Sequence, residues 1–171
     1  LTTGSVYRFK PEPALQTAYL SVLAEIRQAA NSWPAHNAEV AFWQQYLKSL
    51  ESHSRHAFAF SPTNRSAADN NSRDIPMGEN LVWLADHRYK GRKIIVWAAT
   101  FHIARNLPAM DTRIATLSYK DLVTMGDVAW RTLGPRMYAI GFVASGGRAG
   151  AWFRPPPSSL PRVAPESLGG N

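Results

Sequence analysis

Apolar residues recur at helical spacing through the first third of the chain. Over residues 14–30 they lie three or four positions apart, which is the spacing of one face of an amphipathic helix. A second set with the same spacing follows Asn37, whose side chain can cap the start of a helix. The two sets are Leu15, Tyr19, Val22, Leu23 and Ile26, and Val40, Trp43, Tyr46, Leu47 and Leu50. The pattern predicts two helices, the first ending at residues 31–34 and the second ending at about Ser54.

A polar stretch and a third helical pattern come next. Residues 58–71 are rich in Ser, Asn and Asp, which is typical of a loop. The spacing of apolar residues then predicts a helix over about residues 74–89. Ser72 or Asp74 can cap this helix, and Pro76 falls in its first turn, where the missing N–H costs nothing.

Three polar side chains of this helix are candidates for function. At 100° per residue, Asn80 lies on the apolar face and Glu79 points nearly opposite. Arg73 precedes Asn80 by two helical turns, so its side chain points in a similar direction if the helix extends that far. Asn80 and Arg73 can be structural, bonding a backbone group and a buried carboxylate, or Arg73 can hold a substrate oxygen or carboxylate.

The longest apolar run, residues 94–99, follows a basic turn. Its β-branched centre predicts a strand buried on both faces, as in a parallel sheet. Ligands of such sheets bind beyond the carboxyl ends of the strands. Thr100 and His102 stand at that end, so the prediction places a functional site there with His102 as its principal residue.

The last third of the chain is predicted to form a short helix and a pair of strands. Thr124 and Asp127 resemble a capping box, which opens a helix that Gly134 ends. Residues 137–144 are apolar and strand-like, and residues 149–153 are predicted to return as their hairpin partner.

These elements predict an α/β fold, with a partly parallel central sheet flanked by helices and a C-terminal strand pair. Residues 1–153 are expected to form a single α/β domain. Residues 154–171 are rich in Pro, Ser and Gly and are predicted to be a disordered tail.

Composition narrows the classes of function. With no Cys among 171 residues, disulfides, thiolate metal sites and a Cys nucleophile are excluded, although the compartment is not identified. The net charge is +7, but the basic residues are scattered except in the turn at residues 88–93. No nucleic-acid motif or apolar run of about 18 residues is present, so no nucleic-acid or membrane partner is predicted. His53 and His56 are read as a solvated helix end, with a metal site as the less favoured alternative.

Two segments, residues 72–84 and 95–102, carry a family resemblance. They are similar to the erythromycin esterase-like family, whose members show an Arg-Asp…Met-Ala-Glu-Asn helix followed by Trp-Ala-His-Asn-x-His. Matches at Phe42-Trp43 and from Met125 to Phe142 extend the resemblance over about residues 43–153. The resemblance implies hydrolysis of an ester or lactone, with macrolides as the namesake substrates, and some members are linked to succinoglycan synthesis.

The chain departs from the family pattern at two places. Ala99 and Thr100 stand where the motif has its first His and its Asn, and only the second His is matched, by His102. Glu79 matches the motif's Glu. The family also has a Gly-Glu-x-x-His site in an amino-terminal half, and this chain is expected to represent mainly the carboxyl-terminal half. A missing half or a partner chain is therefore an expected partner.

The predicted chemistry is hydrolysis of a small-molecule ester or lactone by water, with no metal or cofactor. His102 is the catalytic base, while Arg73, Asn80, Thr100 and Glu79 are predicted to bind substrate. The carboxylate that orients His102 is left open among the acidic residues Asp74, Glu79 and Asp111. A serine hydrolase is not favoured, because no Gly-x-Ser-x-Gly elbow is present. The alternative is a non-catalytic binding or subunit protein that lost the first motif His at Ala99.

Overall fold

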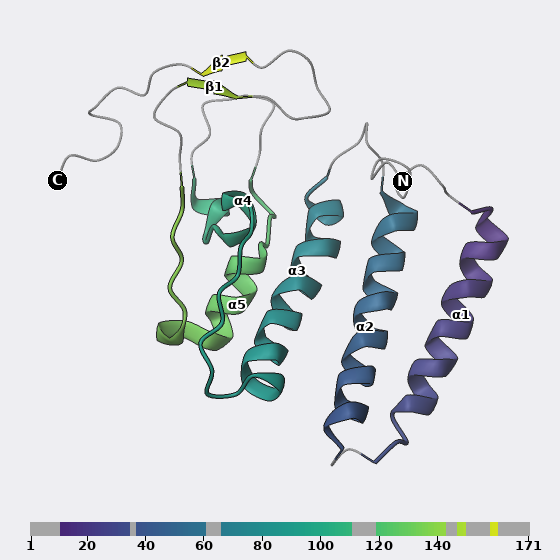
Figure 1. The fold of residues 1–171 in the computed structure, drawn as a ribbon. Coiled ribbons are helices and arrows are strands. Elements are labelled where there is room, and N and C mark those ends of the chain that lie inside the picture. The colour runs from purple at the N-terminus through teal and green to yellow at the C-terminus, as the bar shows by residue number, and fades with distance from the viewer. Residues whose placement is uncertain are drawn as a thin grey trace. The chain divides into compact units, whose positions relative to one another are not determined.

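A computed structural model describes residues 11–34, 37–60, 66–110, 119–142, 147–149 and 158–160. The chain divides into two compact units, Leu1–Ala139 and Ile140–Asn171. The helices of the first unit are α1 (Pro13–Ala30), α2 (Ala38–Ala59), α3 (Ala67–Trp83), α4 (Thr100–Ile103) and α5 (Met125–Leu133). A π-helical turn, Leu84–Arg88, continues α3, and 3-10 turns occupy Leu107–Ala109 and Gly134–Arg136. Figure 1 shows these elements along the chain.

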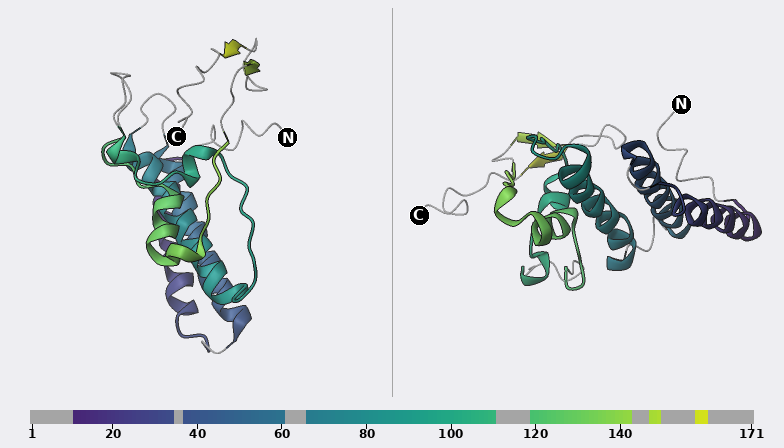
Figure 2. Two further views of the ribbon diagram at one scale, coloured as in Figure 1. Left: turned by 90° about the vertical axis from the view of Figure 1, so that its left-hand side faces the viewer. Right: turned by 90° about the horizontal axis from the view of Figure 1, so that it is seen from below.

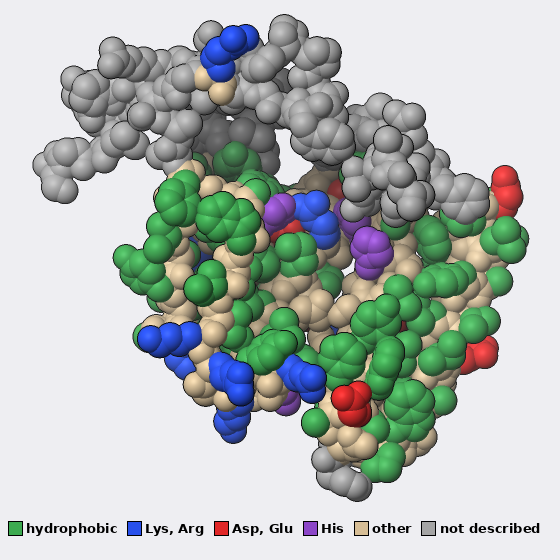
Figure 3. Space-filling view, in the orientation of Figure 1, with side chains coloured by type: hydrophobic (Ala, Val, Ile, Leu, Met, Phe, Trp, Pro, Cys, Tyr) green, Lys and Arg blue, Asp and Glu red, His purple; other side chains and the backbone are tan. Residues whose placement is uncertain are grey.

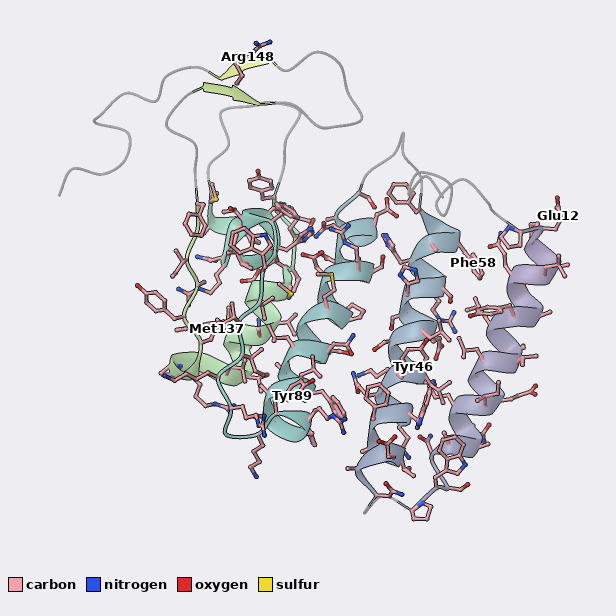
Figure 4. All side chains as sticks on the ribbon, viewed as in Figure 1. Glu12, Tyr46, Phe58, Tyr89, Met137 and Arg148 are labelled. Atoms are coloured by element: carbon pink, nitrogen blue, oxygen red, sulfur yellow. The ribbon has the colours of Figure 1, made fainter. Side chains whose placement is uncertain are left out.

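The long helices pack in the order of the sequence. α1 contacts α2, α2 contacts α3, and α3 contacts α5, which also touches the short helix α4. The right-hand view of Figure 2 shows the first three helices as successive neighbours. Aromatic side chains join the first pair: Phe58 near the end of α2 meets Tyr19 of α1 edge to face, with ring centroids 5.9 Å apart (Figure 4). The amphipathic spacing therefore produces a layer of helices.

Local capping signals explain where three of these helices begin. Asn37 caps α2 by accepting the backbone N–H of Glu39 at 2.9 Å, as predicted. Thr124 and Asp127 form the predicted reciprocal capping box at the start of α5. Both predictions are confirmed, and α1 also covers the predicted residues.

The start of α3 was predicted wrongly. Ser66 and Asp69 form a capping box, so the helix begins at Ala67, and residues 66–71 are not a loop. Pro76 lies inside the helix, where it removes one backbone hydrogen bond, and is not in the first turn. As a result, Arg73 and Asp74 project from the middle of a continuous helix.

The predicted α/β fold is wrong. Residues 93–99 form no helix and belong to no sheet in the described part of the chain. Ile95 is 93% exposed and Trp97 is 89% exposed, so this run is not a strand buried on both faces. The β-branched residues favour extended backbone, whereas a sheet also requires a neighbouring strand in register. The described residues of the first unit are helical where they form regular structure.

The second unit contributes the sheet that the described residues contain. β1 (Gly147–Ala149) pairs antiparallel with β2 (Ser158–Leu160), and Gly147 lies opposite Leu160. Residues 137–142 of the first predicted strand form no strand, and residues 143–144 and 150–153 lie outside the described residues. Ala149, which was expected to pair with that strand, instead lies opposite Ser158. Residues 143–146, 150–157 and 161–171, which include most of the predicted tail, are outside the described residues.

The best-buried side chains gather around α5. Met125, Ala129 and Leu133 of this helix are buried, and Gly78 of α3 lies against Val128. By contrast, α1 and α2 keep large apolar side chains at the surface, including Leu15, Val22, Trp43 and Tyr46. Figure 3 shows this apolar surface over the two helices. No helix among the described residues is long and apolar enough to cross a membrane.

Candidate functional site

A buried carboxylate on α3 and an imidazole on α4 form the centre of the site. The side chain of Asp74 is 0% exposed. Its Oδ2 lies 2.8 Å from Nδ1 of His102 and also accepts the backbone N–H of Met125 at 3.3 Å. The His102 side chain is 19% exposed, so one edge of the ring reaches the surface while the other bonds the buried carboxylate.

Asp74 determines the proton arrangement of this pair. A carboxylate accepts hydrogen bonds, so the ring proton is assigned to Nδ1, from which it is donated to Oδ2 of Asp74. The guanidinium of Arg73 lies against the ring, with Nη2 2.6 Å from Nε2 and 3.3 Å from Nδ1 of His102, and its Nε lies 3.5 Å from Oδ1 of Asp74. Nη2 is therefore close to both ring nitrogens. The site is thus a cluster of Asp74, His102 and Arg73.

The first turn of α5 fixes the short helix that carries His102. The backbone N–H of His102 donates to the carbonyl of Ala99 at 2.9 Å, which starts the single turn of α4. The buried hydroxyl of Thr124 donates to the carbonyl of Ala104 at 2.6 Å at the other end of that turn. Gly126 lies against the backbone of Ile103 and Ala104, with no space for a side chain. These contacts hold the imidazole beside Asp74.

Two of the predicted site residues come together, and one of the three candidate carboxylates orients the ring. Arg73 and His102 are in direct contact, and Asp74 is the acidic residue that bonds the ring. Glu79 instead pairs with Lys48 of α2 at 2.8 Å on the surface. Asp111 lies outside the described residues.

The other two predicted substrate ligands are Asn80 and Thr100, whose described contacts are with other parts of the protein. The Oδ1 atom of Asn80 accepts hydrogen bonds from Gln45 at 2.5 Å and from Ser49 at 2.8 Å, so the inward amide joins α3 to α2. Thr100 begins α4 and is exposed. Its carbonyl accepts the N–H of Ala104, which supports the turn that carries His102.

His56 was misjudged from the sequence. It is buried between α2 and α3, not part of a solvated helix end, and its Nδ1 lies 2.8 Å from Oγ of Ser72. Burial lowers the pKa of His56, and the positive charges of Arg73 and His53 add to this effect. Helical spacing showed that His56 lay near the end of α2, but the packing of α3 against that end was not visible in the sequence. In Figure 3, purple histidine side chains lie on both sides of a blue basic one.

His56 is expected to make the stability of the protein depend on pH. Because its pKa is lowered in the folded state, the unfolded chain binds the proton more readily, and stability falls as the pH drops below about 6.5. The free energy of unfolding of His56→Gln should therefore decline less than that of the wild type between about pH 7 and about pH 5. Urea unfolding at several pH values measures this, with the exposed His87→Gln as the control. Equal pH dependence in wild type and His56→Gln would contradict the assignment.

The described residues contain no group of three His, Cys, Asp or Glu side chains that could hold a metal ion. What they do contain is an imidazole whose Nδ1 is held by a buried carboxylate and whose ring lies against the guanidinium of Arg73. A carboxylate bonded to one nitrogen of an imidazole is an arrangement suited to proton transfer by a neutral histidine.

One of the comparisons with known proteins gives a family for the chain. The family model described as erythromycin esterase matches residues 3–168. The chain therefore belongs to the erythromycin esterase family, and the match extends beyond the residues on which the resemblance was based. No curated protein and no solved structure gives a significant match.

Proposed function

We propose that the protein hydrolyses an ester or lactone, with His102 as the general base. The observation that carries the proposal is the 2.8 Å bond between His102 and the fully buried Asp74. A carboxylate in this position holds the ring in the tautomer whose Nε2 has a lone pair, and it stabilises the imidazolium formed during reaction. Membership of the erythromycin esterase family supports a hydrolytic role.

The proposed reaction uses three groups of the site. Nε2 of His102 takes a proton from water while the water oxygen attacks the carbonyl carbon of the ester. The negative charge that develops on the carbonyl oxygen is stabilised by the guanidinium of Arg73. When the bond to the leaving alkoxide breaks, the proton passes from Nε2 to that oxygen, and a carboxylic acid and an alcohol result. Macrolide lactones are the first natural substrates to assay, because the family takes its name from them.

Replacing His102 tests the proposal directly. His102→Ala should lower kcat/KM for an activated ester and for a macrolide lactone by about 10²–10⁴-fold, because the group that accepts the proton is removed. His53→Ala is the matched control, since it removes an exposed imidazole from the end of α2. Circular dichroism shows whether both variants keep their helices. Equal rates for wild type and His102→Ala would rule out this mechanism.

A second candidate function is a non-catalytic subunit that binds another polypeptide. Its support is the run at residues 93–99, which is rich in β-branched residues and in which Ile95 is almost fully exposed outside any helix or sheet of the described chain. Such a segment can accept a partner strand by backbone pairing. Ala99, at the position of the motif's first His, fits the loss of catalysis. A chain inactive on all esters, with a solution mass that includes a partner, would favour this function over hydrolysis.

A further inference from the structure

Positively charged side chains gather at one end of the helical unit. Residues 84–93, which form the π-helical turn and the turn after it, contain four Lys and Arg residues and one acidic residue. The last turn of α5 and the 3-10 turn that follows add two Arg residues and no acidic one. All six cations are exposed, and Figure 3 shows basic side chains gathered at the lower end of α3 and α5. We call these cations the basic end: Arg88, Lys90, Arg92, Lys93, Arg131 and Arg136.

Only the tertiary structure joins the two basic segments. Arg136 reaches from the 3-10 turn after α5 to Asp86 in the π-helical turn, with 2.7 Å between Nη1 and Oδ1. This pair holds together segments that are 50 residues apart in the sequence. Figure 4 accordingly places the labelled residues Tyr89 and Met137 at the same end of the first unit. Because Asp86 is neutralised by Arg136, the other cations of the basic end keep an excess of positive charge.

Large apolar and aromatic side chains lie among the cations. Tyr89, between two cations of the turn, is 44% exposed, and Tyr138, two residues after the last cation, is 90% exposed. Ile95, two residues after the turn, is almost fully exposed. Arg88 lies over the ring of Phe42 at the start of α2, 5.9 Å from its centroid. The basic end is therefore an amphipathic surface as well as a charged one.

This combination fits the surface of a bilayer that contains anionic lipids. Lys and Arg side chains are attracted to anionic headgroups, and Tyr rings favour the boundary between headgroups and acyl chains. Nucleic acids also attract cations and stack on aromatic rings, but an exposed aliphatic side chain such as Ile95 gives a base nothing to stack on. The same side chain can enter the apolar boundary of a bilayer. The exposed side chains thus favour a lipid surface over RNA or DNA.

We propose that the basic end is a docking surface for anionic membranes, which holds the protein at the bilayer surface. Lipid phosphates accept hydrogen bonds from the cations, while Tyr89, Tyr138 and Ile95 enter the headgroup boundary. The sequence predicted no membrane partner because the cations are scattered along the chain, whereas the fold gathers them. His102 lies beside the first turn of α5, and the basic end follows its last turn, so the two sites are separate. The proposal does not rest on the proposed hydrolysis.

Sedimentation of the full chain with lipid vesicles tests the proposal. The two arms are vesicles of phosphatidylcholine alone and vesicles in which about a third of the lipid is phosphatidylglycerol. The wild type should partition about 10-fold or more in favour of the anionic vesicles. Raising sodium chloride from about 0.1 M to about 1 M should remove most of this preference, because it shortens the range of the attraction. Equal partition into both kinds of vesicle, or retention by a single-stranded RNA homopolymer without vesicle binding, overturns the proposal.

Substitutions at exposed side chains locate the docking surface. Arg92→Gln should lower the partition coefficient for anionic vesicles about 5-fold, the factor expected for one cation near such a surface. Tyr138→Ser should weaken the binding that persists at high salt, because its contribution is not electrostatic. Circular dichroism should show unchanged helices in both variants.

Arg55→Gln is the matched control for charge. Arg55 is also exposed, but it lies about 20 Å along α2 from Phe42, and its partner Glu51 keeps a second ion pair with Arg27. This variant should bind anionic vesicles like the wild type. An equal loss of binding in Arg55→Gln and Arg92→Gln would mean that net charge and not the basic end causes the binding, and it overturns the proposal. Wild-type binding by Arg92→Gln and Tyr138→Ser overturns it as well.

Discussion

Asp74→Asn is expected to lower kcat/KM for ester hydrolysis by about 10³–10⁴-fold, which is the loss seen when the carboxylate behind a catalytic histidine becomes an amide. In the wild type, Oδ2 of Asp74 accepts N–H groups from both His102 and Met125, and Oδ1 faces Arg73. An amide cannot accept on both sides. If the amide oxygen accepts from His102 and Met125, the NH₂ group faces the guanidinium of Arg73, which is also a donor. In the opposite orientation, the NH₂ group faces the N–H groups of His102 and Met125.

The same substitution should also lower the free energy of unfolding by about 1–3 kcal/mol, because it leaves a buried polar group badly paired. Steady-state kinetics and urea unfolding measure the two effects. Asp86→Asn is the matched control, since Asp86 forms an exposed ion pair with Arg136 at 2.7 Å, and such pairs contribute little. Wild-type kcat/KM in Asp74→Asn would show that this carboxylate does not assist the reaction.

Gly126→Ala is expected to destabilise the fold by about 3 kcal/mol or more and to lower activity with it. An added Cβ at position 126 would overlap the carbonyl oxygen of Ile103 and would lie 2.6 Å from that of Ala104. These are backbone atoms, so the contact cannot be relieved by rotating a side chain. The turn of α4 must move away from α5, and His102 moves with it, away from Asp74.

Gly91→Ala provides the control for this prediction. Gly91 has a φ of +76° and no atom within 4 Å of an added Cβ, so its replacement introduces backbone strain of about 1–2 kcal/mol without a clash. Urea unfolding compares the two variants, and ester hydrolysis shows whether loss of activity accompanies only the first. An equal loss of stability in both variants would mean that α4 can shift freely against α5.

Local sequence signals were sufficient for the helices whose ends are fixed by neighbouring residues. The cap at Asn37 and the box of Thr124 and Asp127 each involve hydrogen bonds across two or three residues, so their geometry follows from the sequence alone. The same rule would have found the start of α3, because Ser66 and Asp69 have the required spacing. This capping box was missed because the polar composition of residues 58–71 was interpreted as a loop. This error placed Arg73 at the end of a helix instead of inside one.

The carboxylate that bonds His102 could not be chosen from local sequence signals. Arg73 and His102 were selected from the sequence as residue types suited to ester hydrolysis, but the choice of Asp74 over Glu79 came from the packing of α3 on α5. Asp74 faces α5 and is buried there, whereas Glu79 pairs with Lys48 at the surface. A bond between residues 28 positions apart depends on that packing, which hydrophobic periodicity does not encode.

The sequence by itself determined the first two helices, two of the helix caps and membership of the erythromycin esterase family. These features depend on contacts between near neighbours or on residue order. Only the tertiary structure decided that residues 93–99 enter no sheet of the described chain and that His102 bonds both Asp74 and Arg73. Strand pairing and burial of a carboxylate both require groups from distant parts of the chain, and their positions are set by packing.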